Sequence, residues 1–208
     1  MSELANTLRL CGSEGRNGAT VELLWHAASS RVTFTAPHAQ PTRRDGAHKP
    51  RELRVGDLAL EAARRSNSNA LVPLTAGCLD GNWHEESVFR KKLWPLLAPR
   101  SVLLDLHGMD NDHGVDLVYG TAGGATPAWL LDAALDAAAS MRVAVRHDGP
   151  LSASPRTITA AACAAGHAAL QVEIAAKWRS APPATPTATA ILDVLVRLAR
   201  FAGAHGNA

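Results

Sequence analysis

Residues Leu103 to Asp112 read LLDLHGMDND, an apolar run that changes into histidine, glycine and aspartate. The run begins at Ser101, and Ser101 to Leu106 has the length and composition of a strand buried on both faces. The polar groups that follow, up to His113, resist burial unless they are paired. Two interpretations follow: a metal site at the carboxyl end of a strand, or a polar loop that merely begins there.

Other strand-like runs alternate with helical patterns along the chain. The strands are expected at Val32 to Ala36, Ala70 to Thr75, Val115 to Tyr119, Arg142 to Arg146 and Ala168 to Ile174. The helices are expected at Val55 to Arg65, Glu86 to Leu97, Pro127 to Ala139, Thr157 to Ala165 and Thr187 to Gly203. This alternation predicts a three-layer α/β/α fold with a mainly parallel central sheet. The stretch APPATP, residues 181–186, is interpreted as a hinge before the last helix.

Composition and charge narrow the class of protein. With 208 residues, 47% hydrophobic and 19% charged, the chain is expected to fold as one domain, residues 1–208. A net charge of +2 is too small to favour nucleic acid or an anionic membrane as a partner. The three cysteines are odd in number and far apart, and the sequence has neither a signal pattern nor an apolar run of membrane-helix length. We therefore expect a cytoplasmic protein that acts on a small molecule.

Polar residues follow or end several of the predicted strands. They are His38, Asp80, Asn82, His84, His107 and Glu173. Binding sites of open parallel sheets collect at the carboxyl ends of the strands, and imidazoles joined by a carboxylate suit zinc. The helical zinc-protease motif is absent, because HEESV has Val88 where a second histidine is required.

Six segments occur in the same order as the motifs of the N-formylglutamate amidohydrolase family, which the chain resembles from Val32 to Arg179. They are TAPHAQP, DGNWHEE, LLDLHGM, VDLVYGT, GPLSASPRTIT and ALQVEIAAKWR. The resemblance implies a fold similar to the zinc carboxypeptidases, within the phosphorylase/hydrolase-like group. Gly108 replaces a serine of the family motif, and Trp83 replaces an arginine that is expected to hold a substrate carboxylate.

The resemblance also implies a zinc centre. His38 and His107 match the two histidines that bind zinc in the family, and Asp57 is the expected third ligand, with Glu52 as the alternative. Glu173 matches the family's glutamate, which resembles the general base of the carboxypeptidases. The implied cofactor is therefore Zn²⁺, bound by two histidines and one carboxylate.

Further residues are implied on the substrate side. Arg156 matches a catalytic, substrate-facing arginine that binds a carboxylate through two parallel hydrogen bonds, and Thr157 is assigned to the same site. Asn82 and His84 either orient the scissile carbonyl or cap the following helix. Asp105 is expected to orient the histidine two residues after it by hydrogen bonding.

The expected reaction is hydrolysis of an amide bond in an N-formyl or N-acyl amino acid, or a related acidic small substrate, by zinc-activated water. Two alternatives remain open at this point. One is another metal-dependent hydrolase, either a peptidase or a phosphoesterase, although phosphoesterases usually use more carboxylates to hold two metals. The other is a zinc-less binding protein with the same fold.

Overall fold

The computed structural model describes residues 13–14, 19–25, 27, 30–179 and 186–205. The hinge predicted at residues 181–186 lies outside this part of the chain, apart from Pro186, which begins the last helix. All statements below concern the described residues.

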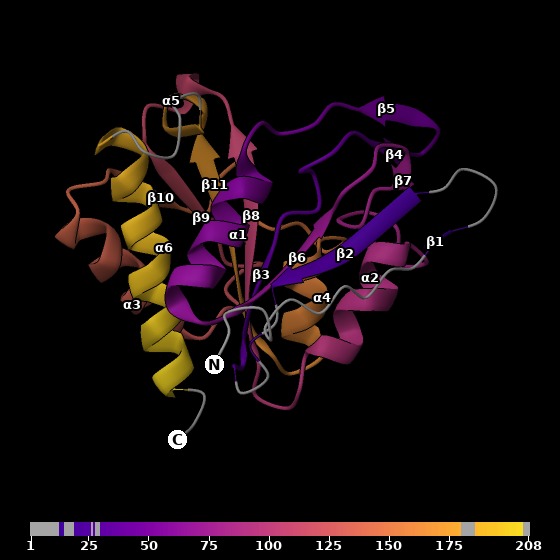
Figure 1. Ribbon diagram of the computed structural model, residues 1–208. Coiled ribbons are helices and arrows are strands. Elements are labelled where there is room, and N and C mark those ends of the chain that lie inside the picture. The colour runs from indigo at the N-terminus through magenta and orange to yellow at the C-terminus, as the bar shows by residue number, and fades with distance from the viewer. Residues whose placement is uncertain (1–12, 15–18, 26, 28–29, 180–185, 206–208) are drawn as a thin grey trace, which may run out of the picture.

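A central sheet of eight strands forms the middle layer (Figure 1). In spatial order the strands are β1 (Ser13–Glu14), β2 (Ala19–Trp25), β6 (Asn69–Pro73), β3 (Val32–Thr35), β8 (Val102–Met109), β11 (Ala168–Ala175), β9 (Leu117–Gly120) and β10 (Val145–His147). Strands β6, β3, β8 and β11 run parallel to one another, whereas β2 and β9 pair antiparallel with this group. The predicted mainly parallel sheet is confirmed.

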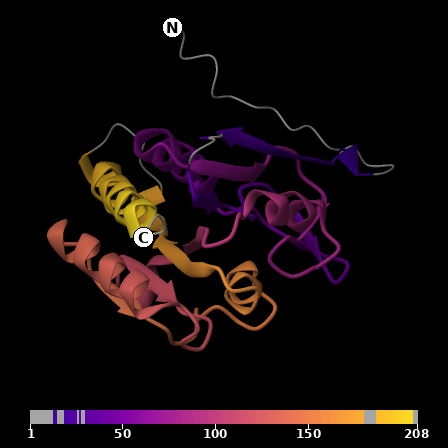
Figure 2. The same cartoon turned by 90° about the horizontal axis from the view of Figure 1, so that it is seen from below.

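Helices cover both faces of the sheet, as Figures 1 and 2 show. On one face lie α1 (Val55–Ser66), α3 (Ala128–Ser140) and α6 (Pro186–His205). On the other lie α2 (Val88–Leu93) and α4 (Ile158–Ala164). The predicted three-layer architecture is confirmed. In the described part of the chain, no helix combines the length and apolar character needed to cross a membrane.

Strand β8 explains how the polar site arises. Leu104 and Leu106 belong to the larger core with α1, α3 and α6, and Leu103 belongs to the smaller core with α2 and α4. Successive side chains of a strand point to opposite faces, so Asp105 and His107 share the face of Leu103. This face is therefore apolar at the start of β8 and polar at its carboxyl end.

Several element boundaries differ from the sequence prediction, by three residues at the start of β10, and two of these differences have a clear physical reason. Strand β8 continues past Leu106 to Met109, because its pairing with β11 extends to that residue, so His107 lies within the strand. Helix α2 begins at Val88, because the Ser87 side chain accepts a hydrogen bond from the backbone N–H of Arg90 and thereby caps the helix. The sequence predicts this helix from Glu86 to Leu97. After α2 ends at Leu93, the chain continues as the short 3₁₀ helix η3 (Trp94–Leu96).

Several short elements near the site show no pattern in the sequence that predicts them. A three-stranded sheet has the order β5 (Ala47–Lys49), β4 (Thr42–Arg44) and β7 (Cys78–Leu79). The 3₁₀ helix η4 (Asn111–His113) and the single-turn helix α5 (Ala176–Arg179) follow β8 and β11. These elements surround the carboxyl ends of the central strands.

Candidate metal centre

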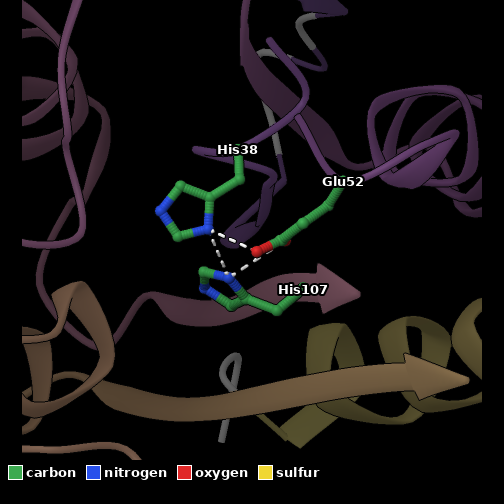
Figure 3. A group of neighbouring side chains, drawn as sticks. All are labelled: His38, Glu52 and His107. Atoms are coloured by element: carbon green, nitrogen blue, oxygen red, sulfur yellow. Dashed lines mark hydrogen bonds and ion pairs between the residues drawn. The ribbon is translucent and has the colours of Figure 1, made fainter. Parts of the chain in front are cut away.

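His38, Glu52 and His107 converge at the carboxyl end of the sheet (Figure 3). His38 Nδ1 lies 2.8 Å from Glu52 Oε1 and 3.0 Å from His107 Nδ1. His107 Nδ1 lies 3.4 Å from the other oxygen of Glu52. One ligand atom from each residue falls within 4.8 Å of the others, and no second group of this kind occurs among the described residues.

Glu52 is fixed in this position by contacts from three directions. Its backbone N–H donates to the carbonyl of His38 at 2.8 Å, which draws the loop before α1 back to the turn after β3. Its Oε2 accepts from the backbone N–H of Gly108 at 2.9 Å, and its Oε1 accepts from Lys49 Nζ at 3.0 Å. These three hydrogen bonds therefore fix the position and orientation of the Glu52 carboxylate.

Both imidazoles are held at Nε2 by a fully buried aspartate. His38 Nε2 lies 2.9 Å from Asp80 Oδ1, and His107 Nε2 lies 3.1 Å from Asp105 Oδ2. A carboxylate on one imidazole nitrogen fixes the ring orientation and makes the other nitrogen a better ligand. In both histidines the other nitrogen, Nδ1, faces the centre of the group.

The two aspartates are themselves anchored. Asp80 accepts from Arg44 at 2.7 Å and from the backbone N–H of Asn82 at 2.9 Å. Asp105 accepts from the hydroxyl of Thr35 on the adjacent strand β3 at 2.6 Å. The prediction that Asp105 orients His107 agrees with this geometry.

The charges of the group stabilise one another. Burial alone would raise the pKa of Glu52, but hydrogen bonds and charge interactions with His107 and His38 outweigh it and lower that pKa well below its usual range. Burial alone would lower the pKa of His107, but Asp105 and Glu52 outweigh it and raise that pKa well above its usual range. Two nitrogens and an ionised carboxylate form a donor set that suits zinc, and a cation bound there takes the place of the His107 proton.

Glu173 lies beside this group. In the parallel pair of β8 and β11 it is directly opposite His107, so the two side chains share one face of the sheet. It is buried, and it accepts from Gln171 Nε2 at 3.0 Å. Burial raises the pKa of Glu173, and the nearby Glu52 and Asp105 add to this effect, while the histidines oppose it. A glutamate with a raised pKa can exchange protons closer to neutral pH.

Asp57, the expected third ligand, is not brought to the two histidines. It lies exposed in the first turn of α1, with Oδ2 3.4 Å from Arg54 Nε, where the helix dipole favours an acid. In place of Asp57, the structure brings Glu52, the alternative third ligand, beside His38 and His107. The backbone hydrogen bond that places Glu52 is a tertiary contact, and no local pattern in the sequence signals it.

The remaining predicted residues occupy different places. Asn82 reaches the group, with Nδ2 3.4 Å from His107 Nε2, and its Oδ1 accepts from the backbone N–H of Ile158 at 2.9 Å. The Thr157 side chain caps helix α4. The contacts of the His84 ring are with two exposed acids, Asp45 and Glu86. Arg156 is exposed and lies on the loop before α4, with its guanidinium against the ring of Trp83.

The chain has no match by sequence, but it has clear matches by structure. No known protein family and no curated protein matches the chain by sequence. N-formylglutamate amidohydrolase from Ralstonia eutropha is similar in structure, with a TM-score of 0.62 and 14% identity over 83% of this chain and 93% of that protein. The two chains share one fold. The resemblance predicted from the six motifs is thus confirmed at the level of the fold.

Two further solved structures support this result. A bacteriophage poly-gamma-glutamate hydrolase aligns with a TM-score of 0.56 and 14% identity, over 93% of this chain and 91% of that one. A candidate carboxypeptidase from Burkholderia mallei aligns with a TM-score of 0.51 and 10% identity, over 96% of this chain and 63% of that one. The fold is therefore carboxypeptidase-like.

Gly108, which replaces the serine of the family motif, is explained by a close contact. The buried Arg179 guanidinium donates to the carbonyls of Ile174, Leu53 and Met109 at 2.9, 2.8 and 3.0 Å. A Cβ atom at Gly108 would lie 2.5 Å from Arg179 Cζ, too close for both groups to keep their places. The glycine therefore makes room for an arginine that links the ends of β8 and β11 to the loop carrying the ligand carboxylate.

Replacement of Gly108 by alanine should destabilise the protein by about 2–4 kcal/mol, because the added methyl displaces Arg179 from its three carbonyls. Urea unfolding measures this change. The matched control is Gly203→Ala in helix α6, where the new Cβ meets only Val32 at 3.7 Å, so stability should stay the same or rise by about 1 kcal/mol. Equal stability of the two variants would contradict the role given to the Arg179 contact.

Proposed function

We propose that this protein is a zinc-dependent amidohydrolase that cleaves the amide bond of an N-formyl or N-acyl amino acid, or of a related acidic small molecule. The observation that carries the proposal is the convergence of His38 Nδ1, His107 Nδ1 and the Glu52 carboxylate within 4.8 Å. Three protein ligands leave one position of a tetrahedral zinc for water or substrate, which distinguishes catalytic from structural zinc sites. The fold shared with N-formylglutamate amidohydrolase supports the same class of reaction.

Glu173 is the proposed general base. When zinc is bound at the centre, it supplies an acidified water and polarises the amide carbonyl. Glu173 lies directly across the strand pair from His107, and its raised pKa suits a group that accepts a proton from the attacking water. The same carboxyl group then returns the proton to the leaving nitrogen.

Arg156 is the proposed site for a substrate carboxylate. Its side chain is exposed, and within the described part of the chain its guanidinium makes no hydrogen bond or ion pair. It can therefore bind a carboxylate through two parallel hydrogen bonds. Asn82 Oδ1 accepts from the backbone N–H of Ile158, and its Nδ2 lies 3.4 Å from His107 Nε2, so we assign Asn82 to holding the Arg156 loop beside the centre.

Substitution of Glu52 by glutamine should lower zinc affinity by at least about 100-fold, because an amide lacks the charge and basicity of the carboxylate ligand. Competition with a chelator measures this affinity, and elemental analysis gives the zinc content. Asp57→Asn is the matched control, since it makes the same chemical change at an exposed acid in the next helix.

Similar zinc affinity in the Glu52 and Asp57 variants would remove Glu52 from the ligand set. A wild-type protein that binds no zinc at micromolar concentrations would favour the alternative of a zinc-less binding protein.

Replacement of Glu173 by glutamine should reduce hydrolysis of an N-formyl amino acid by about 10²–10⁴-fold, because the variant cannot accept a proton. Zinc content should equal that of wild type, and thermal stability should not fall, since the amide removes the cost of a buried charge. Steady-state kinetics on the zinc-loaded protein test this. Wild-type turnover by the variant would rule out Glu173 as the base.

Zinc affinity should rise with pH through the neutral range. The raised pKa of His107 means that a proton occupies this ligand up to a higher pH than in an ordinary histidine, and zinc must displace it. Glu52, with its lowered pKa, is ionised throughout this range and adds no pH dependence. Chelator competition at several pH values measures the slope, and a zinc affinity that is flat between pH 6 and about 8 would contradict the prediction.

A further inference from the structure

Trp83, which replaces the arginine of the family motif, carries two guanidinium groups against its ring. Arg156 Cζ lies 4.6 Å from the ring centroid and Arg44 Cζ lies 4.7 Å from it. The half-buried indole is held at its edge, where Nε1 donates to Asp45 at 2.8 Å. The ring is thus a fixed platform for two cations.

The two arginines use this platform differently. Arg44 also binds Asp80, with contacts of 2.8 and 2.7 Å to one carboxylate oxygen, so its donors are engaged in the support of the metal centre. The Arg156 guanidinium has the ring as its contact among the described residues. Asp45 is occupied by the indole N–H, and Asp80 by Arg44. Neither carboxylate pairs with the Arg156 guanidinium, so within the described part of the chain its N–H donors remain available to a ligand.

The nature of the contact matters for what Arg156 can bind. A carboxylate that held this guanidinium would occupy two of its N–H donors. An aromatic face attracts the positive charge without using a donor, so the donors stay available for a ligand. The ring therefore orders the side chain while it preserves the hydrogen-bonding capacity of the guanidinium.

The backbone of the Arg156 loop is tied to the segment around the tryptophan. The buried Arg90 guanidinium donates to the carbonyl of Arg156, and Asn82 accepts from the backbone N–H of Ile158 at 2.9 Å. The amide of Asn82 also reaches His107, at 3.4 Å. These bonds tie the loop to Asn82, whose amide lies 3.4 Å from a ligand histidine, so the loop borders the metal centre.

We infer that Trp83 is a positioning residue for carboxylate recognition, and that it presents the Arg156 guanidinium to a free carboxylate of the ligand. The inferred ligand class is an N-acyl amino acid, or a peptide end, whose carboxylate lies close to the amide. The inference rests on the proposed function for the reaction, but the recognition of the carboxylate can be measured by binding alone.

The test compares tryptophan, leucine and phenylalanine at position 83 in zinc-loaded protein that also carries Glu173→Gln, so that the probes are bound without being hydrolysed. The probes are N-acetylalanine, which carries a carboxylate, and N-acetylalaninamide, its neutral analogue, and NMR titration gives both affinities. Both variants lose the indole bond to Asp45, so the difference between them isolates the aromatic face. Affinity for N-acetylalanine should fall about tenfold in the leucine variant and stay within about threefold of wild type in the phenylalanine variant.

A second readout follows the arginine itself. The side-chain Nε–H signal of Arg156, assigned by its loss in Arg156→Lys, should shift on addition of N-acetylalanine and not of the neutral amide. The leucine variant should lose the ring-current displacement of this signal, and the phenylalanine variant should keep part of it. The loss of ring-current displacement only shows that the ring no longer covers the guanidinium; an unchanged shift of the Arg156 signal on addition of N-acetylalanine to the leucine variant would contradict a positioning role for Trp83.

The outcomes separate this inference from the proposed function. Equal binding of the two probes with tryptophan at position 83, or an equal loss of affinity for both probes in the leucine variant, would overturn the inference even if the wild-type protein hydrolyses amides. Selective loss of carboxylate binding in the leucine variant, together with no amidohydrolase activity in the wild-type protein, would support the inference and refute the proposed function.

Discussion

The site depends on two buried carboxylates that fix the direction of two imidazoles. Asp80 and Asp105 each hold the Nε2 atom of one histidine, and this leaves the Nδ1 atoms of His38 and His107 facing each other at 3.0 Å. Two imidazole lone pairs repel at this separation, so a proton or a metal cation must lie between them. Burial of so many charges is costly unless each has a partner. The surrounding residues supply those partners, and the arrangement suits a cation at its centre.

The topology of the sheet makes this convergence possible. Strands β3, β8 and β11 are neighbours and run parallel, so their carboxyl ends meet at one edge. The turn after β3 carries His38, β8 carries His107 and β11 carries Glu173 opposite it. The small sheet beside this edge adds two cations. Arg44 forms an ion pair with Asp80, and Lys49 forms one with Glu52. Strand order thus brings His38, His107 and Glu173 together, and the loop before α1 and the small sheet add the remaining groups.

This topology also explains which parts of the site could be predicted from the sequence. The buried central strands have long apolar runs, and His107 and Glu173 are recognisable because they interrupt such runs at the carboxyl end. Strands β4 and β5 read TRR and AHK, which are too short and polar to show a strand pattern. Glu52 could not be chosen over Asp57, because its place depends on a bond to a distant carbonyl. Asp57 has the stronger local signal, and that signal reflects the helix dipole.

Gly108 and Trp83, which depart from the motif of the N-formylglutamate amidohydrolases, each contact arginine side chains elsewhere in this chain. Gly108 leaves the space that the Arg179 guanidinium fills, and Trp83 supplies the face on which two guanidinium groups rest. An arginine in place of Trp83 would add a third positive charge next to Arg44 and Arg156, and the three would repel one another. An aromatic ring instead attracts both cations. With Arg156 and Arg44 both against this ring, a tryptophan at position 83 is electrostatically more compatible than an arginine.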